Sequence, residues 1–129
     1  MNPLSKHSRF IAILAGGLLL RVLLAFVVFP KQGFSTDMQL FAGWATTLAR
    51  VGPGAFYATA SSADYPPGYM YILWFLGNAP ASALPLLLKV PPILADLGIA
   101  AVLYWAGRRW LGERAGLASA ALYFFIPVT

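Results

Sequence analysis

The sequence contains no cysteine and a single histidine, His7, near its N-terminus. The absence of cysteine excludes disulfides and thiolate metal sites. One histidine cannot form a metal cluster by itself, and two acids in one loop, Asp37 and Asp64, do not make a metal site without a known separation. The residues therefore define no metal site and give no sign of a cofactor.

Charge is also scarce. Only 10% of the 129 residues are charged, against about 25% in a soluble globular domain, and 60% are hydrophobic. The mean hydropathy is +0.73. This balance predicts an integral membrane protein, and the many aromatic residues fit the bilayer interface. The net charge of +5 is spread over short stretches, which suits contact with anionic membrane lipid. No basic run with interleaved aromatics indicates a nucleic-acid partner.

Long apolar segments define the expected architecture. About 20 apolar residues cross a bilayer as a helix. The sequence predicts an all-α integral membrane protein with about three transmembrane helices, the first being an uncleaved anchor. The predicted segments are residues 10–29, residues 84–106 and a partial segment at residues 115–129.

The stretch between the first two segments, residues 30–83, predicts an external loop with surface helices. An amphipathic helix capped by Ser35 or Thr36 runs to Gly52-Pro53-Gly54, and its apolar face suits the membrane surface. The apolar run 69–76 is half the spanning length, so it predicts a second surface or re-entrant helix.

Lysine and arginine placement sets the predicted topology. Lys6 and Arg9 precede the first segment, and three arginines follow the second in a short turn, so both flanks are expected in the cytoplasm. The loop 30–83 then faces outward. The three arginines are Arg108, Arg109 and Arg114.

Asp37 is the first candidate for chemistry. An aspartate in the first turn of a helix is favoured by the helix dipole and needs no further function. A carboxylate at the bilayer rim beside Phe41 and Trp44 could instead be partly desolvated, which tunes it toward general-base work. From the residues alone, a helix-terminal role for Asp37 is favoured over the role of a general base.

Asp64-Tyr65-Pro66-Pro67-Gly68 forms a rigid corner, because its prolines restrict the backbone and push Tyr65 toward an extended conformation. A helix that starts with proline explains one of the prolines. A rigid corner also positions side chains, which makes Asp64 and Tyr65 candidates for a site.

Arg21, Lys89 and Asp96 fall within apolar segments, where charged residues are costly and are functional candidates by default. Lys89 lies near the outer end of its segment, where it could contact a phosphate at the level of the lipid heads. Asp96 lies about two turns deeper on the same face and needs a partner, either Lys89 or Arg21. For Asp96, a role in a functional site and a role in a structural ion pair are weighed evenly. Arg21 could pair with Asp96 or bind a lipid phosphate.

Taken in order, these features resemble the N-terminal part of polytopic GT-C type glycosyltransferases, including bacterial mannosyltransferase-like proteins that use polyprenyl-phosphate sugars. The resemblance covers nearly the whole chain and depends on the order of the features rather than on one motif. The order is an anchor with an embedded Arg21, the external Asp37, the stretch Gly52 to Tyr57, the stretch Tyr65 to Gly68, the stretch Lys89 to Asp96, and Arg108-Arg109.

The resemblance implies an inverting transferase that moves a sugar from a polyprenyl-phosphate donor to a hydroxyl of a glycan, lipid or protein acceptor on the outer membrane face. It implies that Asp37 is the catalytic base toward that hydroxyl and that Lys89 contacts the donor phosphate. The candidate substrate-binding residues are Arg21, Tyr57, Asp64, Tyr65, Lys89 and Asp96.

Members of that superfamily are several-fold longer than this chain, so the sequence is expected to be a fragment that is inactive alone. The expected location is a multi-pass position in the bacterial plasma membrane with a cytoplasmic N-terminus. One alternative is a small non-catalytic membrane protein, such as an assembly partner or a transporter subunit. Another is a membrane-embedded ligase or oligosaccharide transferase of the same architecture.

Overall fold

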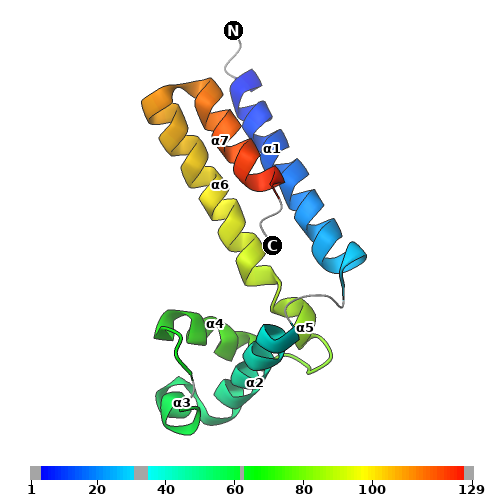
Figure 1. Cartoon of the computed structure of the whole chain (residues 1–129), viewed down its shortest axis with the longest axis vertical. Coiled ribbons are helices and arrows are strands. Elements are labelled where there is room, and N and C mark those ends of the chain that lie inside the picture. Colours follow the sequence, from blue (N-terminus) through cyan, green and yellow to red (C-terminus); the bar gives the residue numbers. More distant parts are fainter. Residues whose placement is uncertain (1–3, 31–34, 62, 127–129) are drawn as a thin grey trace. The chain divides into compact units, whose positions relative to one another are not determined.

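The chain is all-helical over the residues that the computed structural model describes, which are 4–30, 35–61 and 63–126 (Figure 1). It divides into two compact units. The first comprises Met1–Val28 with Pro92–Thr129, and we call it the long-helix unit. The second comprises Phe29–Pro91, and we call it the loop unit. The all-α class expected from the sequence is confirmed for the described part of the chain.

The long-helix unit is built from α1 (Leu4–Val22), the π-helical turn η1 (Leu23–Val28), most of α6 (Val90–Leu111) and α7 (Glu113–Phe125). The helical stretches Ser8–Val28 and Leu84–Leu111 are long and apolar enough to cross a membrane. They match the predicted segments 10–29 and 84–106. The 13 residues of α7 fall short of the roughly 20 that a span needs. A third span over 115–129 is therefore not confirmed, and residues 127–129 lie outside the described residues.

The second apolar helix ends later than predicted. Arg108 and Arg109 were expected in the turn after the helix but lie in the last turn of α6, where basic side chains favour the negative end of the helix dipole. Gly112, with φ of 95°, ends the helix because glycine tolerates the left-handed region. The turn between α6 and α7 is therefore shorter than the sequence indicated.

Prolines interrupt the same segment near its start. The short helix α5 (Leu84–Leu87) is separated from α6 by Leu88 and Lys89, which form a turn. Pro91 and Pro92 cannot donate backbone hydrogen bonds to the preceding turn, so the helical ladder is broken there. The interruption lies at Leu88 and Lys89, and both prolines fall in the first turn of α6.

Close contacts at glycines hold the long-helix unit together. A Cβ added to Gly17 of α1 would collide with the ring of Phe124 in α7. A Cβ added to Gly107 would lie 2.8 Å from Cα of Gly116, so α6 and α7 also meet at glycines. Small residues of this kind let helices approach closely where lipid supplies no hydrophobic drive between them.

The loop unit contains α2 (Ser35–Val51), α3 (Pro53–Thr59), α4 (Pro67–Gly77) and α5. The start and end of α2 match the predicted helix, and α4 matches the predicted short helix over 69–76. α3 is not predicted by the sequence pattern, because Gly52 and Pro53 also form a helix stop signal. Gly52, with φ of 78°, reverses the chain, and Pro53 then starts a new helix, as proline readily does in a first turn.

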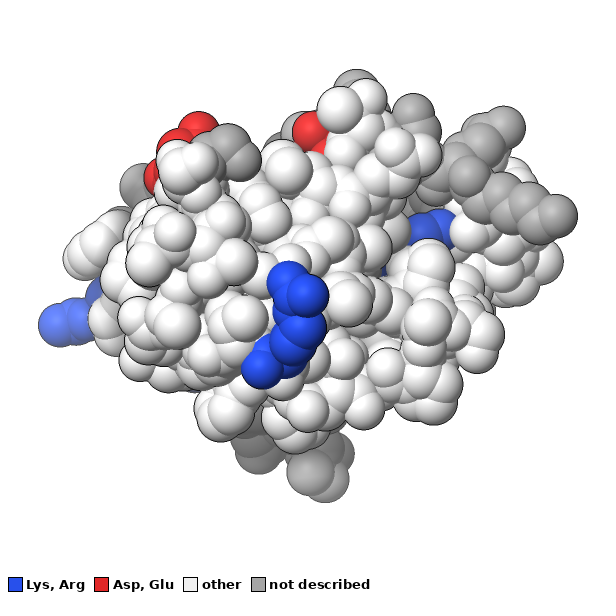
Figure 2. All heavy atoms as spheres, turned by 90° about the horizontal axis from the view of Figure 1, so that it is seen from below, with Lys and Arg blue, Asp and Glu red and all other residues white. Residues whose placement is uncertain are grey.

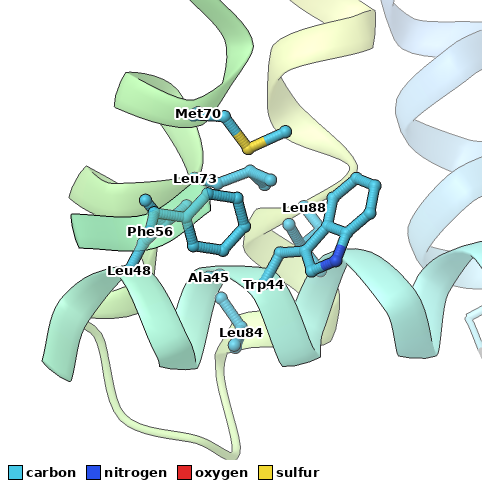
Figure 3. Packing of buried hydrophobic residues seen from close by; sticks show 8 residues of the cluster. All are labelled: Trp44, Ala45, Leu48, Phe56, Met70, Leu73, Leu84 and Leu88. Atoms are coloured by element: carbon cyan, nitrogen blue, oxygen red, sulfur yellow. The ribbon is translucent and has the colours of Figure 1, made fainter. Parts of the chain in front are cut away.

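The core of the loop unit lies between α2 and α4 (Figure 3). The backbones are closest at Gly77, where an added Cβ would collide with the carbonyl of Ala45. The apolar face of α2, predicted to lie on the membrane, is thus taken up by this core. The core residues are Trp44, Ala45, Leu48, Phe56, Met70, Leu73, Leu84 and Leu88.

Candidate functional site

Asp37 lies in the first turn of α2, and its side chain is exposed. Residues 37, 41 and 44 follow one another at helical spacing, so Asp37 shares one face of α2 with Phe41 and Trp44. Among the described residues, no hydrogen bond or ion pair is formed by Asp37. Its carboxylate lies one turn before the first aromatic ring of that face and is open to solvent, so the partial desolvation expected beside Phe41 and Trp44 is not observed, and the role of a general base stays a prediction.

An aromatic cluster continues the face that Asp37 begins. The ring of Phe41 meets the rings of Trp44, Tyr65 and Tyr69 edge-on, at centroid distances of 5.8, 5.5 and 5.5 Å. Tyr65 also meets Trp44 at 5.6 Å. Edge-to-face pairs at these distances add stability beyond burial, so the side chains of the cluster hold fixed positions. We define the aromatic cluster as Phe41, Trp44, Phe56, Tyr57, Tyr65 and Tyr69.

Tyr57 and Tyr65 are brought together by the fold, although α3 was not predicted. The hydroxyl of Tyr57 donates to the backbone carbonyl of Tyr65 over 2.8 Å, which ties α3 to the corner before α4. Both side chains remain exposed, at 39% and 43%. They therefore combine a fixed position with surface that a ligand can reach, as a binding residue requires.

Tyr69 belongs to this surface and was not among the predicted site residues. Burial raises the pKa of its phenol, and the neighbouring Tyr65 raises it further by charge repulsion. The phenol of Tyr69 therefore stays protonated and able to donate a hydrogen bond at ordinary pH. The signal that could have identified it is its spacing, four residues after Tyr65 and in the first turn of α4.

Asp64 is exposed in the corner next to Tyr65. Among the described residues, its carboxylate forms no hydrogen bond or ion pair. The loop unit therefore offers two exposed carboxylates, Asp37 and Asp64. The structure brings Tyr65 against the face that begins with Asp37, and Asp64 precedes Tyr65 directly in the chain.

Lys89 contacts the backbone of its own unit. Its ammonium donates to the carbonyl oxygens of Phe29 and Pro30 over 3.0 and 3.1 Å. These carbonyls directly follow the end of η1, where backbone acceptors lose their partners in the helix. The contacts assign Lys89 an anchoring role at the entry to the loop unit, and a contact with a donor phosphate stays a prediction.

Arg21 and Asp96 form an ion pair in the long-helix unit, with Nη1 of Arg21 3.0 Å from Oδ2 of Asp96. Oδ1 of Asp96 accepts the hydroxyl of Tyr123 over 2.6 Å. The guanidinium of Arg21 also faces the ring of Phe124 at 5.0 Å. The sequence left Lys89 and Arg21 as possible partners of Asp96, and in the structure the partner is Arg21. The structural ion pair is therefore observed. Binding of substrate by Arg21 and Asp96 stays a prediction.

A hollow of about 530 Å³ lies against the opposite face of α2. It contains a single charged residue, Arg50, and no acid, so it offers no general base. The hollow is lined by Ala42, Gly43, Thr46, Thr47, Arg50, Ala81, Leu84 and Pro85. The side of α2 that carries Asp37 and the aromatic cluster is therefore the better candidate for chemistry.

The arrangement offers two exposed carboxylates, Asp37 and Asp64, and aromatic side chains whose phenol groups lie at the edge of the cluster. Aromatic rings supply apolar area, and the phenols supply hydrogen bonds, which together suit a sugar or another polyol. In the described part of the chain, no group of three or more potential ligands could hold a metal ion.

Comparisons of the chain with protein-family models, with curated proteins and with solved structures find no match.

Proposed function

We propose that this chain forms the N-terminal part of an inverting membrane glycosyltransferase of the GT-C type. The enzyme would take a sugar from a polyprenyl-phosphate donor and transfer it to an acceptor hydroxyl on the outer face of a bacterial plasma membrane. The chain would be a multi-pass protein with a cytoplasmic N-terminus, and the loop unit would face outward.

The observation that carries the proposal is the alignment of Asp37 with the aromatic cluster. An aspartate that served only as a helix-terminal charge could lie on any face of α2. This one lies on the face of Phe41 and Trp44, with its carboxylate exposed and free of protein partners among the described residues. An acceptor sugar resting on the exposed rings of the cluster, Tyr57 and Tyr65, would bring a hydroxyl toward that carboxylate.

The proposed step is a single displacement at the anomeric carbon. Asp37 accepts the proton of the acceptor hydroxyl while the hydroxyl oxygen forms a bond to that carbon. The bond from the anomeric carbon to the phosphate oxygen breaks, and polyprenyl phosphate leaves with the electron pair. The configuration of the sugar is inverted because attack and departure occur on opposite sides. Tyr57, Asp64 and Tyr65 would bind the acceptor beside the base.

The test is Asp37→Asn in the protein expressed from its own gene in its own membrane. Transfer of labelled sugar from polyprenyl-phosphate donor is measured in membrane vesicles, together with the protein level. Loss of a general base lowers the rate by roughly 100-fold to 10,000-fold. The matched control is Arg50→Gln, which also changes one charge on α2 but on the opposite face, and it should leave transfer intact. Normal transfer by Asp37→Asn at a normal protein level would remove Asp37 from catalysis.

A non-catalytic membrane protein is the second candidate, and one observation favours it. Arg21, Lys89 and Asp96, three of the predicted site residues, are engaged by the protein's own side chains and backbone. Groups used in this way stabilise a fold without needing a substrate. On this alternative, Asp37→Asn has no effect in any sugar-transfer assay, whereas changes to the Arg21–Asp96 pair lower the amount of folded protein.

A further inference from the structure

The outer face of α4 is apolar and unusually exposed. Phe75 is 78% exposed and Tyr71 is 57% exposed, and Ile72 and Trp74 are each exposed to about two fifths. These large side chains lie within five consecutive positions. Monomeric soluble proteins rarely expose contiguous apolar surface of this kind, and such patches mark interaction sites.

The other face of α4 is apolar as well. Met70 and Leu73 are buried in the core of the loop unit, and Gly77 lies against the backbone of α2. The helix carries no charged residue. A helix that is apolar all round is stable when it is enclosed by protein or lipid, and the described residues of the loop unit enclose α4 on one side only.

The outer face of α2 has the opposite character. Gln39, Thr46 and Arg50 are exposed polar or charged positions at helical spacing, with Leu40 exposed beside them, while the other face of α2 packs on α4. The loop unit therefore has a polar side on α2 and an apolar side on α4, with the core between them. Figure 2 shows how few charged side chains interrupt the surface that it displays.

The chain itself indicates what covers the apolar side. The loop unit begins at Phe29, directly after the candidate span Ser8–Val28, and ends at Pro91, within the candidate span Leu84–Leu111. A unit joined at both ends to membrane-crossing helices is held at the bilayer surface. Its apolar side then has lipid within reach, and aromatic residues such as Tyr71 and Trp74 are enriched at that depth.

We propose that α4 is the membrane-contacting element of the loop unit and that its outer face inserts into the lipid interface. Its 11 residues extend over about 16 Å, half of a bilayer core, so α4 lies in the interface and does not cross. α2 lies on the water side of the unit. This contact requires membrane-spanning helices but does not depend on the proposed glycosyltransferase activity.

The experiment uses the depth of two tryptophans in the full chain, reconstituted in vesicles of phosphatidylcholine and phosphatidylglycerol. One variant keeps Trp74 alone, with Trp44, Trp105 and Trp110 changed to Phe. Its matched control keeps Trp44 alone. Lipids brominated on the upper acyl chain quench a nearby indole. We expect several-fold stronger quenching of Trp74 than of Trp44, which is buried in the core at 5% exposure.

Equal quenching of the two tryptophans, or quenching of Trp74 only by a water-soluble quencher, would overturn the proposal. A second copy of the chain is the other possible cover. Because the sequence has no cysteine, Phe75→Cys creates a single thiol that reports on this directly. Rapid disulfide dimer formation by Phe75→Cys in the same vesicles would assign the face to self-association instead of lipid. Slow reaction with a water-soluble maleimide, compared with fast reaction of Gln39→Cys on α2, supports insertion.

Discussion

Replacing Asp96 with leucine removes one half of the ion pair in the long-helix unit. Asp96 accepts one contact from Arg21 at 3.0 Å and one from the Tyr123 hydroxyl at 2.6 Å. The two charged side chains are 15% and 24% exposed. Asp96→Leu thus leaves the Arg21 guanidinium in largely apolar surroundings without its counter-charge.

The expected cost follows from this burial. Breaking a buried ion pair by removing one partner costs about 3–5 kcal/mol, because the remaining charge is uncompensated. The ring of Phe124, 5.0 Å from the guanidinium, retains part of the stabilisation of Arg21. We therefore expect the lower end, about 3 kcal/mol, for Asp96→Leu.

The assay is a double-mutant cycle on the full chain in detergent micelles, with unfolding by dodecyl sulfate followed by circular dichroism. Arg21→Leu and Asp96→Leu should each be strongly destabilising, while the double variant should be near the wild-type protein because both charges are gone. The exposed pair of Arg108 with Glu113, 3.2 Å apart with Arg108 49% exposed, is the control. Arg108→Gln should cost at most about 1 kcal/mol.

Additive losses in the cycle would refute the reasoning, because two residues that compensate one another cannot contribute independently. The same holds if Asp96→Leu costs no more than Arg108→Gln. In either case the ion pair would not be what holds Arg21 in the long-helix unit.

Two further predictions concern the loop unit. Gly77→Ala should destabilise it by about 1–3 kcal/mol because the new methyl group collides with the carbonyl of Ala45. Gly43→Ala, which has open space around the added carbon, should be neutral or stabilising. Thermal unfolding of the two variants compares these effects. The raised pKa of Tyr69 predicts pH dependence: its stabilising contribution is full below the pKa of an unfolded tyrosine, about 10, and is lost as pH rises through the higher folded value. The free energy of unfolding should therefore fall less steeply with rising alkaline pH for Tyr69→Phe than for the wild type. The same pH dependence in both proteins would contradict the role of burial.

Local signals in the sequence located most of the helices. The run of apolar residues before Pro30 predicted the first long helix, and the helical spacing after Ser35 predicted α2, because both depend on neighbours only a turn away. α3 was missed because a glycine followed by a proline can both end one helix and start the next. α6 extends beyond the predicted end at residue 106, because Arg108 and Arg109 suit the last turn of a helix as well as the turn that follows it.

The candidate site was only partly readable from the sequence. Asp37 and its position in the first turn of α2 follow from spacing alone, as does its alignment with Phe41 and Trp44. The contact of those rings with Tyr65 and the addition of Tyr69 to the cluster depend on how α4 packs on α2, which no local pattern specifies.

The sequence by itself determined that the chain is helical, poor in charge and apolar, since composition and periodicity are properties of neighbouring residues. It predicted about three membrane-crossing helices, of which the described residues contain two candidates. The tertiary structure decided the partners. In the folded chain Asp96 pairs with Arg21, and Lys89 donates to the carbonyls of Phe29 and Pro30. The apolar face of α2 packs on α4. Each of these pairings joins residues far apart in the chain, so packing in three dimensions, and not spacing, fixes which charge is compensated and which apolar face remains for lipid.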